Sequence, residues 1–342
     1  MIRVLVADDS TFMREVISDT LNSEPGIEVI GTAKNGFDAV RKTRELKPDV
    51  VTLDVQMPLM DGLEALTDIM VGCPTPVVML SAFTKKDADV VIECLRRGAV
   101  DFVAKPSGTV SPDIGEVKAE LIEKVKIASK AKVHRVDVTP RKIQIKKSIP
   151  IPIKKVVCIG VSTGGPPALE EVLTKIPQYF PACILIVQHI PSFFTAFLAK
   201  RLDARSAIMV KEAKDGESLR TGEALIAPGD YHMTLKKRGI RKVVSLKKSP
   251  RIDGHRPNIN LMMESASEIY GPDTIGVILT GMGNDGVRGM EYIKMRGGRT
   301  ICQDESTSVV FGMPGAVIKQ GNVDKVLPIG EIAQEIIKMV YE

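Results

Sequence analysis

The sequence predicts an α/β protein built from two doubly wound parallel sheets, one in each half of the chain. Short apolar runs alternate with segments of helical period through most of the 342 residues. Polar or glycine-rich turns follow nearly every apolar run, so polar side chains are expected at the carboxyl ends of parallel strands. The length suits two domains better than one.

The composition is that of an ordinary globular protein, with 44% hydrophobic and 26% charged residues. The chain contains no run of about 18 apolar residues, so we expect no membrane insertion. Its first residues lack the pattern of a secretory signal. The five cysteines are scattered, mostly within apolar runs, which favours reduced thiols and a cytoplasmic location.

The net charge of +5 is unevenly distributed along the chain. Residues 124–155 hold eleven lysines and arginines against one acid, Asp137, and the segment mixes prolines and lysines without a settled period. We interpret 124–153 as an extended basic linker between a domain at 1–123 and a domain at 154–342. No aromatic residue interleaves with the basic ones, so a nucleic-acid partner is not expected.

The first domain opens with an apolar strand at residues 2–7, and Ser10 is placed to cap the helix that follows. Met13, Ile17 and Leu21 recur on one face of that helix. Four further strands are expected at 28–31, 49–54, 76–80 and 99–104. Helices are expected at 36–46, from Leu63 onward, and at 116–131.

Residues that can carry phosphoryl chemistry fall at the carboxyl ends of these strands: Asp8, Asp9, Asp54, Ser81 and Lys105. We expect them to lie together, because these ends share one edge of a parallel sheet. Three neighbouring carboxylates repel one another unless a cation neutralises them, and an all-oxygen set suits Mg²⁺. The set predicts a phosphoryl-acceptor site with Asp54 as nucleophile. Helix capping would explain Asp8 or Asp9 singly, but not the whole set.

This half of the chain resembles the response-regulator receiver family, which has a flavodoxin-like fold. The resemblance is carried by Asp8-Asp9, Asp54, Met57-Pro58-x-Met60-Asp61-Gly62, Ser81-Ala82 and Lys105-Pro106. It implies phosphoryl transfer from a chemotaxis histidine kinase to Asp54. It also implies Mg²⁺ bound near Asp8 by Asp9, Asp54 and the backbone carbonyl of Gln56. Ser81, Phe102 and Lys105 match the positions that respond to phosphorylation in the family.

The second domain starts with a buried strand at 156–159, a tight turn and a helix that begins at Pro166-Pro167. Apolar strands follow at 182–188, 207–210, 224–227 and 274–280, with a hairpin formed by 233–236 and 242–246. Helices are expected at 192–202, 259–269 and 329–339. The pattern is that of a Rossmann-like α/β domain.

Ser162 stands in the turn after the first of these strands, within the spacing Gly160-x-Ser162-x-Gly164. The spacing fits a nucleophile elbow, but it also fits a glycine-rich phosphate cradle or a plain strand–helix turn. The cradle is the weaker interpretation, because the turn lacks the lysine of a P-loop.

His189 and Asp285 also follow buried strands, so a parallel sheet would bring them to the same edge as Ser162. That is the arrangement a Ser-His-Asp triad requires. The glycines around Asp285 would leave backbone N–H groups free to stabilise an oxyanion. Other histidines and aspartates compete for these roles, and a set of Ser162, Asp230 and His255 stays open on sequence order alone. The remaining rivals are His232 and Asp253.

Further motifs resemble the catalytic domain of the CheB methylesterase family. They are Ile159-Gly160-x-Ser162-Thr163-Gly164-Gly165, Gln188-His189, Pro228-Gly229-Asp230-Tyr231-His232-Met233, His255-Arg256-Pro257-Asn258 and Leu279-Thr280-Gly281-Met282-Gly283-x-Asp285-Gly286. The resemblance implies a triad of Ser162, His189 and Asp285. It also implies the backbone N–H of Met282 as oxyanion donor and Thr163 beside the triad. Val161 and Asn284 depart from the alanines often found there, and His255-Arg256 has no assigned role.

The two resemblances together imply a phosphorylation-activated hydrolase of chemotaxis adaptation. Its substrates would be glutamyl methyl esters and particular glutamines on the cytoplasmic helices of chemoreceptors, with no cofactor needed for the esterase reaction. The unphosphorylated receiver is expected to pack over the catalytic face and obstruct substrate. The alternative is a non-enzymatic response regulator whose output domain binds a nucleotide or a protein partner through its glycine-rich loops.

Overall fold

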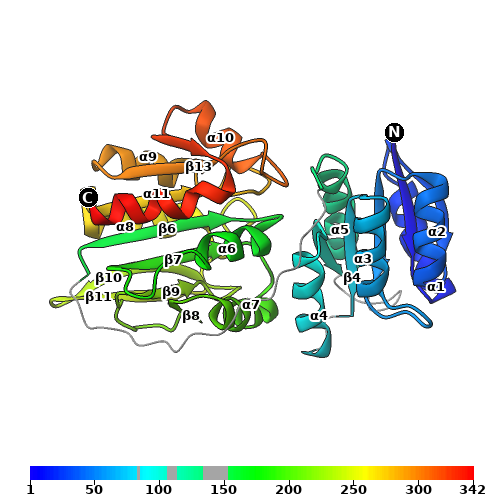
Figure 1. The fold of residues 1–342 in the computed structure, drawn as a ribbon, viewed down its shortest axis with the longest axis horizontal. Helices are drawn as coiled ribbons and strands as arrows, with labels where there is room; N and C mark the ends of the chain where they lie inside the picture. The colour runs from blue at the N-terminus through cyan, green and yellow to red at the C-terminus, as the bar shows by residue number, and fades with distance from the viewer. Residues whose placement is uncertain (83–84, 106–113, 134–152) are drawn as a thin grey trace. The chain divides into compact units, whose positions relative to one another are not determined.

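The computed structural model describes residues 1–82, 85–105, 114–133 and 153–342 and divides into two compact units, Met1–Thr139 and Pro140–Glu342 (Figure 1). Each unit is an α/β structure around a parallel sheet, so the predicted fold class is confirmed. Within the described ranges, no helix combines the length and the apolar character that crossing a bilayer requires.

The first unit has five parallel strands in the order β2-β1-β3-β4-β5. They are β1 (Ile2–Ala7), β2 (Ile27–Ala33), β3 (Val50–Asp54), β4 (Val77–Ser81) and β5 (Asp101–Ala104). The helices are α1 (Thr11–Asn22), α2 (Gly36–Leu46), α3 (Gly62–Gly72), α4 (Lys85–Arg96) and α5 (Ile114–Ala128). Helix α1 contacts α5, whereas α3 contacts both α2 and α4, so the helices form two groups around the sheet.

Side-chain caps define where three of these helices begin. The Ser10 side chain accepts a hydrogen bond from the Met13 N–H, as the sequence predicted. Asn35 caps α2 and Asp61 caps α3 in the same way. Each capping residue lies in the loop that follows the carboxyl end of a strand. The polar residues at the carboxyl edge of the sheet therefore also begin the helices.

Helix α5 extends past the expected domain boundary at residue 123. Leu121, Val125 and Ala128 recur on one face of α5 and are buried, so residues 124–128 belong to the first unit. The helix expected at 116–131 already crossed that boundary, which was placed from the change in net charge. The rest of the predicted linker is described only at 129–133 and at residue 153, and 134–152 lie outside the described residues.

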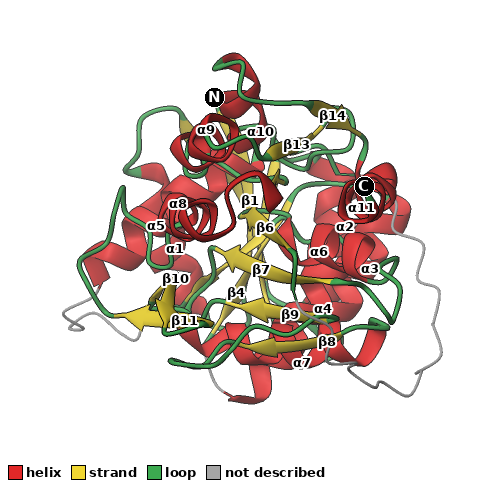
Figure 2. Ribbon diagram, turned by 90° about the vertical axis from the view of Figure 1, so that its left-hand side faces the viewer, coloured by secondary structure: helices red, strands yellow, loops and turns green. Residues whose placement is uncertain are grey.

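The second unit contains seven parallel strands in the order β14-β13-β12-β6-β7-β9-β8. They are β6 (Lys155–Val161), β7 (Ala182–Gln188), β8 (Met209–Glu212), β9 (Glu223–Ile226), β12 (Thr274–Ile278), β13 (Arg299–Gln303) and β14 (Lys325–Leu327). Figure 2 shows β6, β7, β9 and β8 as successive strands of this sheet. A separate antiparallel hairpin is formed by β10 (His232–Arg238) and β11 (Arg241–Lys247), as predicted.

Two groups of helices pack around this second sheet. Helix α6 (Gly165–Leu173) contacts both α7 (Ser192–Arg205) and α11 (Ile329–Tyr341). Helix α8 (Ile259–Tyr270) contacts α9 (Val287–Met295), the hairpin strand β10 and the sheet strand β6. Strands β13 and β14, helix α9 and helix α10 (Met313–Lys319) were not among the predicted elements.

The central strand β6 is flanked by β12 on one side and β7 on the other. Near its end, Gly160 leaves room for the packing of α8: an added Cβ would lie 2.5 Å from Cγ2 of Ile259 and 2.8 Å from Cδ1 of Ile278. Only glycine fits this contact. The carboxyl ends of the three neighbouring strands therefore lead into segments that carry Asp285, Ser162 and His189.

Candidate functional site

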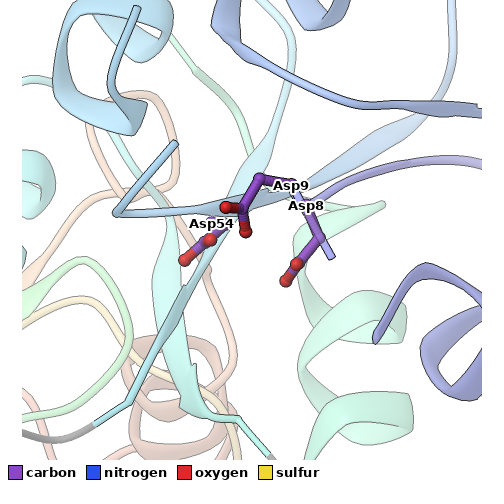
Figure 3. Close-up of side chains that lie close together, drawn as sticks. All are labelled: Asp8, Asp9 and Asp54. Carbon is purple, nitrogen blue, oxygen red and sulfur yellow. The ribbon is translucent and has the colours of Figure 1, made fainter. Parts of the chain in front are cut away.

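An acidic cluster lies at the carboxyl edge of the first sheet, where β1 and β3 are neighbours. Asp8, Asp9 and Asp54 each place a carboxylate oxygen within 4.8 Å of the other two. Figure 3 shows the three side chains gathered at this edge. Asp8 and Asp54 are almost fully buried, whereas Asp9 is exposed and can meet a ligand from solvent.

Lys105 supplies the positive charge at this cluster. Its Nζ lies 2.8 Å from Oδ2 of Asp8 and 2.7 Å from Oδ2 of Asp54. Burial, against the opposing effect of Lys105 and with a contribution from the charge of Asp8, raises the pKa of Asp54 to about 6. Burial also acts to lower the pKa of Lys105, but its bonds to the two aspartates outweigh burial and raise that pKa. The lysine therefore stays charged beside Asp54 at neutral pH.

An open pocket of about 520 Å³ adjoins the cluster and is lined by Asp9, Val55, Gln56, Met57, Pro58, Asp61 and Val90. The loop that forms it passes directly over Asp54. A Cβ at Gly62 would lie only 2.0 Å from the Asp54 carbonyl oxygen, and the Gln56 N–H donates to Asp54 Oδ1 at 3.2 Å. Converging carboxylates beside a solvent-open pocket are the oxygen-rich donor set that Mg²⁺ prefers, so these residues fit the predicted metal.

Ser81 and Phe102 lie on the neighbouring strands β4 and β5, and Lys105 directly follows β5. Ser81 ends β4 and pairs with Ala104 of β5, directly before Lys105. Both Ser81 and Phe102 are about 1% exposed. The Nζ of Lys124 lies 5.0 Å from the centre of the Phe102 ring. The candidate switch residues are thus packed inside the same end of the sheet as Asp54.

A second set of polar residues gathers at the carboxyl edge of the second sheet. Nε2 of His189 lies 2.9 Å from Oδ2 of Asp285. Ser162 follows the intervening strand β6, and its backbone N–H donates to the Thr280 carbonyl at 3.0 Å. The Ser162 turn is thus fastened to the segment that leads to Asp285. Sequence reasoning placed these three residues just past buried strands at one edge of a parallel sheet, and in the structure those strands are the neighbours β12, β6 and β7.

The amino end of helix α8 fixes the carboxylate of Asp285. The backbone N–H of Ile259 donates to Oδ2 at 2.8 Å and that of Asn260 to Oδ1 at 3.0 Å. Burial acts to raise the pKa of Asp285, but the hydrogen bond and charge of His189, together with the two N–H groups, outweigh burial and lower that pKa. Asp285 is therefore a charged, oriented carboxylate in contact with the imidazole.

The loop from Thr280 to Gly286 runs against the candidate nucleophile. A Cβ at Gly281 would lie 2.6 Å from the Ser162 Cβ. The backbone next to Met282 therefore lies so close to Ser162 that only glycine fits at position 281. The Met282 side chain is 41% exposed, and Thr163 is buried with its carbonyl accepting a hydrogen bond from Thr280 Oγ1 at 3.0 Å. These placements suit an oxyanion donor at the Met282 N–H.

Gln188 has a positioning role that the sequence did not predict. Its side-chain Nε2 donates to the Ser162 carbonyl at 2.9 Å, which fastens the turn after β6 to the end of β7. A Cβ at Gly165 would lie 1.9 Å from Gln188 Oε1, so the glycine is needed to admit this amide. The only sequence signal was that Gln188 directly precedes His189.

The rival residues have other contacts. Asp230 forms an ion pair with Arg256 at 3.3 Å, and Nε2 of His232 lies 2.9 Å from the Pro250 carbonyl. The ring of His255 stacks on the ring of His189, with centroids 3.9 Å apart and planes 4° from parallel. These contacts favour the set of Ser162, His189 and Asp285 over the set with Asp230 and His255.

Comparison with known proteins agrees with this geometry. A family model described as CheB methylesterase matches residues 157–336, more than half of the chain. The chain belongs to the CheB methylesterase family. A model described as response regulator receiver domain matches residues 4–111, so the CheB methylesterase domain here follows a receiver domain.

Relatives of this CheB family chain extend over nearly its whole length. A protein-glutamate methylesterase/protein-glutamine glutaminase of Pyrococcus abyssi is 47% identical over 99% of this chain and 94% of its own length. The protein of the same name from Thermotoga maritima is 45% identical over 99% of both chains. The crystal structure of the Thermotoga maritima CheB methylesterase catalytic domain covers 54% of this chain and 98% of its own, with 46% identity and a TM-score of 0.54.

Proposed function

We propose that this chain hydrolyses glutamyl methyl esters of chemoreceptors to glutamate and methanol, and deamidates particular receptor glutamines, with Ser162 as nucleophile. The observation that carries the proposal is the buried His189–Asp285 hydrogen bond at the strand end beside Ser162. The names of the relatives support this enzyme over a non-enzymatic output domain.

In the first step, Ser162 Oγ attacks the ester carbonyl and its proton passes to His189. Because Nε2 of His189 faces Asp285, the basic nitrogen is Nδ1, which is buried and has no hydrogen-bond partner among the described residues. The C=O bond electrons move onto oxygen, where the Met282 N–H stabilises them. The carbon–methoxy bond then breaks, and Nδ1 returns the proton to the leaving oxygen as methanol.

A water molecule completes the reaction. The water attacks the acyl-enzyme carbonyl and gives a proton to Nδ1 of His189. Nδ1 then passes this proton to Ser162 Oγ as the bond between the acyl carbon and Oγ breaks. The product is the free glutamate side chain. With a glutamine side chain the first leaving group is ammonia, and the remaining steps are the same. Asp285 keeps Nε2 protonated and stabilises the imidazolium throughout.

The receiver domain would control this reaction through Asp54, which accepts a phosphoryl group from a chemotaxis histidine kinase. Asp9, Asp54 and the Gln56 carbonyl would hold Mg²⁺, with Asp8 beside them. Such an ion neutralises charge on the transferring phosphoryl oxygens. Lys105, which pairs with Asp54, would then contact one of those oxygens after transfer. Ser81 and Phe102 would then reposition and release the catalytic face.

We place the reaction in the cytoplasm. All five cysteines are free and four are buried, where burial raises the pKa of their thiols. Unreactive thiols without disulfides suit a reducing compartment.

Methanol release from methylated receptor membranes tests the proposal. The phosphorylated wild-type chain should release methanol, and Ser162→Ala should lose turnover by several orders of magnitude. A serine-directed covalent probe should label the wild-type chain at Ser162. An unlabelled Ser162 together with no methanol release would favour the non-enzymatic alternative.

A further inference from the structure

The roles of the three triad residues do not explain why His255 stacks on His189. The two rings are nearly parallel and in van der Waals contact, and His255 comes from a loop far from β7 in the sequence. The His189 ring is therefore held at its edge by Asp285 and on one face by His255. The hydrogen bond restrains the ring at one edge, and a stacked partner further opposes rotation of the ring about the Cβ–Cγ bond.

The loop that carries His255 is rigidly fastened. Ile252 and His255 exchange two backbone hydrogen bonds of 3.1 and 2.9 Å around the turn at Asp253-Gly254, where both residues have positive φ. A hairpin turn of this kind sets the direction of the His255 side chain.

Arg256 ties both ends of this loop to the protein. Its guanidinium donates to the Ser249 carbonyl at 2.9 Å and pairs with the Asp230 carboxylate at 3.3 Å. The Asp230 N–H donates in turn to the Arg256 carbonyl at 3.2 Å. The side chain of Arg256 is only 16% exposed, whereas that of its partner Asp230 is 40% exposed. Residues 249–256 thus form a closed loop, called the brace below, that holds His255 against His189.

We infer that His255 is a positioning residue whose neutral ring keeps Nδ1 of His189 directed at Ser162, and that Arg256 holds His255 in place. The inference rests on the proposed function, because it concerns the general base of that reaction. Misplacement of a catalytic group by about 1 Å can lower a rate by about a hundredfold, so a brace on the imidazole has a measurable consequence.

The stacked ring must also stay uncharged. The charged or titratable groups that act on His255 are His189, Asp285, Asp253 and Arg251. Burial, together with the charge of His189, lowers the pKa of His255 to about 4, although the charges of Asp285 and Asp253 oppose this shift. His189 gains a proton during each half-reaction, and a second positive charge on the adjacent ring would oppose that gain. A neutral partner supports the imidazole without this repulsion.

Three substitutions of His255 in the full-length phosphorylated chain separate these effects. His255→Ala removes the stack and should lower kcat by about 10-fold to 100-fold with little change in KM. His255→Phe restores a neutral flat ring and should recover most of kcat. His255→Arg keeps a planar group but adds a charge at about the ring separation, so the acid limb of the kcat/KM profile should move to lower pH by about 0.7 unit or more.

Arg256→Gln tests the anchor, and Lys247→Ala is the matched control. Arg256→Gln should lower kcat as His255→Ala does, and the double variant should be no slower than the worse single variant, because both act through one contact. Lys247 is exposed at the end of β11 and outside the brace, so its variant should keep wild-type kinetics. Circular dichroism and thermal midpoints confirm that each variant is folded.

The rate at which a serine-directed probe labels Ser162 separates this inference from the proposed function. Labelling of His255→Ala at one-tenth of the wild-type rate or less, restored in His255→Phe, supports the brace. Wild-type kcat and labelling in His255→Ala, or a folded His255→Phe as slow as His255→Ala, would overturn it while leaving Ser162 as nucleophile. A wild-type chain that neither labels nor releases methanol would refute the proposed function instead.

Discussion

Replacing Asp285 by asparagine should impair both catalysis and stability, for reasons that the contacts define. The carboxylate accepts from His189 and Ile259 at Oδ2 and from Asn260 at Oδ1. An asparagine oxygen can replace Oδ2 or Oδ1, but not both. With the oxygen at the Oδ2 position, the amide nitrogen faces the Asn260 N–H, and one buried donor loses its partner. That loss should reduce the free energy of unfolding by about 1–3 kcal/mol.

The decrease in kcat should be larger than the decrease in the free energy of unfolding would suggest. In the first orientation the imidazolium that forms on His189 no longer lies against a negative charge. In the flipped orientation the asparagine amide donates to Nε2, so the proton moves to Nδ1 and the base is lost. By analogy with the same exchange in other Ser-His-Asp hydrolases, kcat should fall by about 10²–10⁴-fold.

The pH dependence of stability gives an independent readout of the same substitution. The pKa of Asp285 is lowered in the folded chain, so its charge stabilises the fold above the unfolded pKa of about 4. This contribution is lost as pH falls through the lowered folded pKa. The difference in unfolding free energy between wild type and Asp285→Asn should therefore be largest near pH 7 and shrink toward acid pH. Methanol release and urea unfolding at several pH values measure both effects. A kcat within threefold of wild type would refute the assigned role of Asp285.

Further predictions concern the two sites and their coupling. Acetyl phosphate should label Asp54 with Mg²⁺ present, and labelling should disappear with EDTA or in Asp54→Asn; phosphorylation unchanged by EDTA would count against the metal site. Gly281→Ala should lower methanol release at least tenfold, since the new Cβ would displace Ser162, and unchanged turnover would show that the loop is farther from the nucleophile than its backbone indicates. A fragment that begins at Lys154 should be faster than the unphosphorylated full chain and indifferent to acetyl phosphate. A tenfold difference needs only about 1.4 kcal/mol between obstructed and open forms, and a fragment no faster than the resting chain would argue against obstruction.

Much of both sites could be predicted from sequence because strand ends in a parallel sheet converge. Asp8, Asp54 and Lys105 directly follow or end apolar runs, and the sheet order brings them into contact. The same reasoning placed His189 and Asp285 at one edge, and their hydrogen bond agrees with it. In each case a local pattern and a general rule of topology were sufficient.

Strand β13 shows where that reasoning stops. Thr300 and Gln303 are polar yet buried, so the strand lacks the continuous apolar run that marked its neighbours. The Gln303 side chain makes one distant and one local hydrogen bond: its Oε1 accepts from the Thr280 N–H, and its Nε2 donates to the Thr307 carbonyl, both at 2.8 Å. The bond to Thr280 joins segments that only the tertiary fold brings together, so no local period reveals it.

The contact between His255 and His189 was beyond prediction for a similar reason. The loop around His255 has no helical or strand period, and its place depends on the ion pair of Arg256 with Asp230, 26 residues away in the sequence. The motif His255-Arg256 was visible, but its spacing does not indicate what it touches. Only the folded structure shows that His255 stacks on His189.

Trapping the acyl-enzyme tests the central claim most directly. The phosphorylated chain is mixed with methylated receptor membranes, quenched with acid within milliseconds, digested and analysed by mass spectrometry while methanol release is followed in parallel. A glutamyl ester on the peptide that contains Ser162, formed as methanol is released and absent from Ser162→Ala, is the predicted result. Methanol release by Ser162→Ala at the wild-type rate would contradict the account.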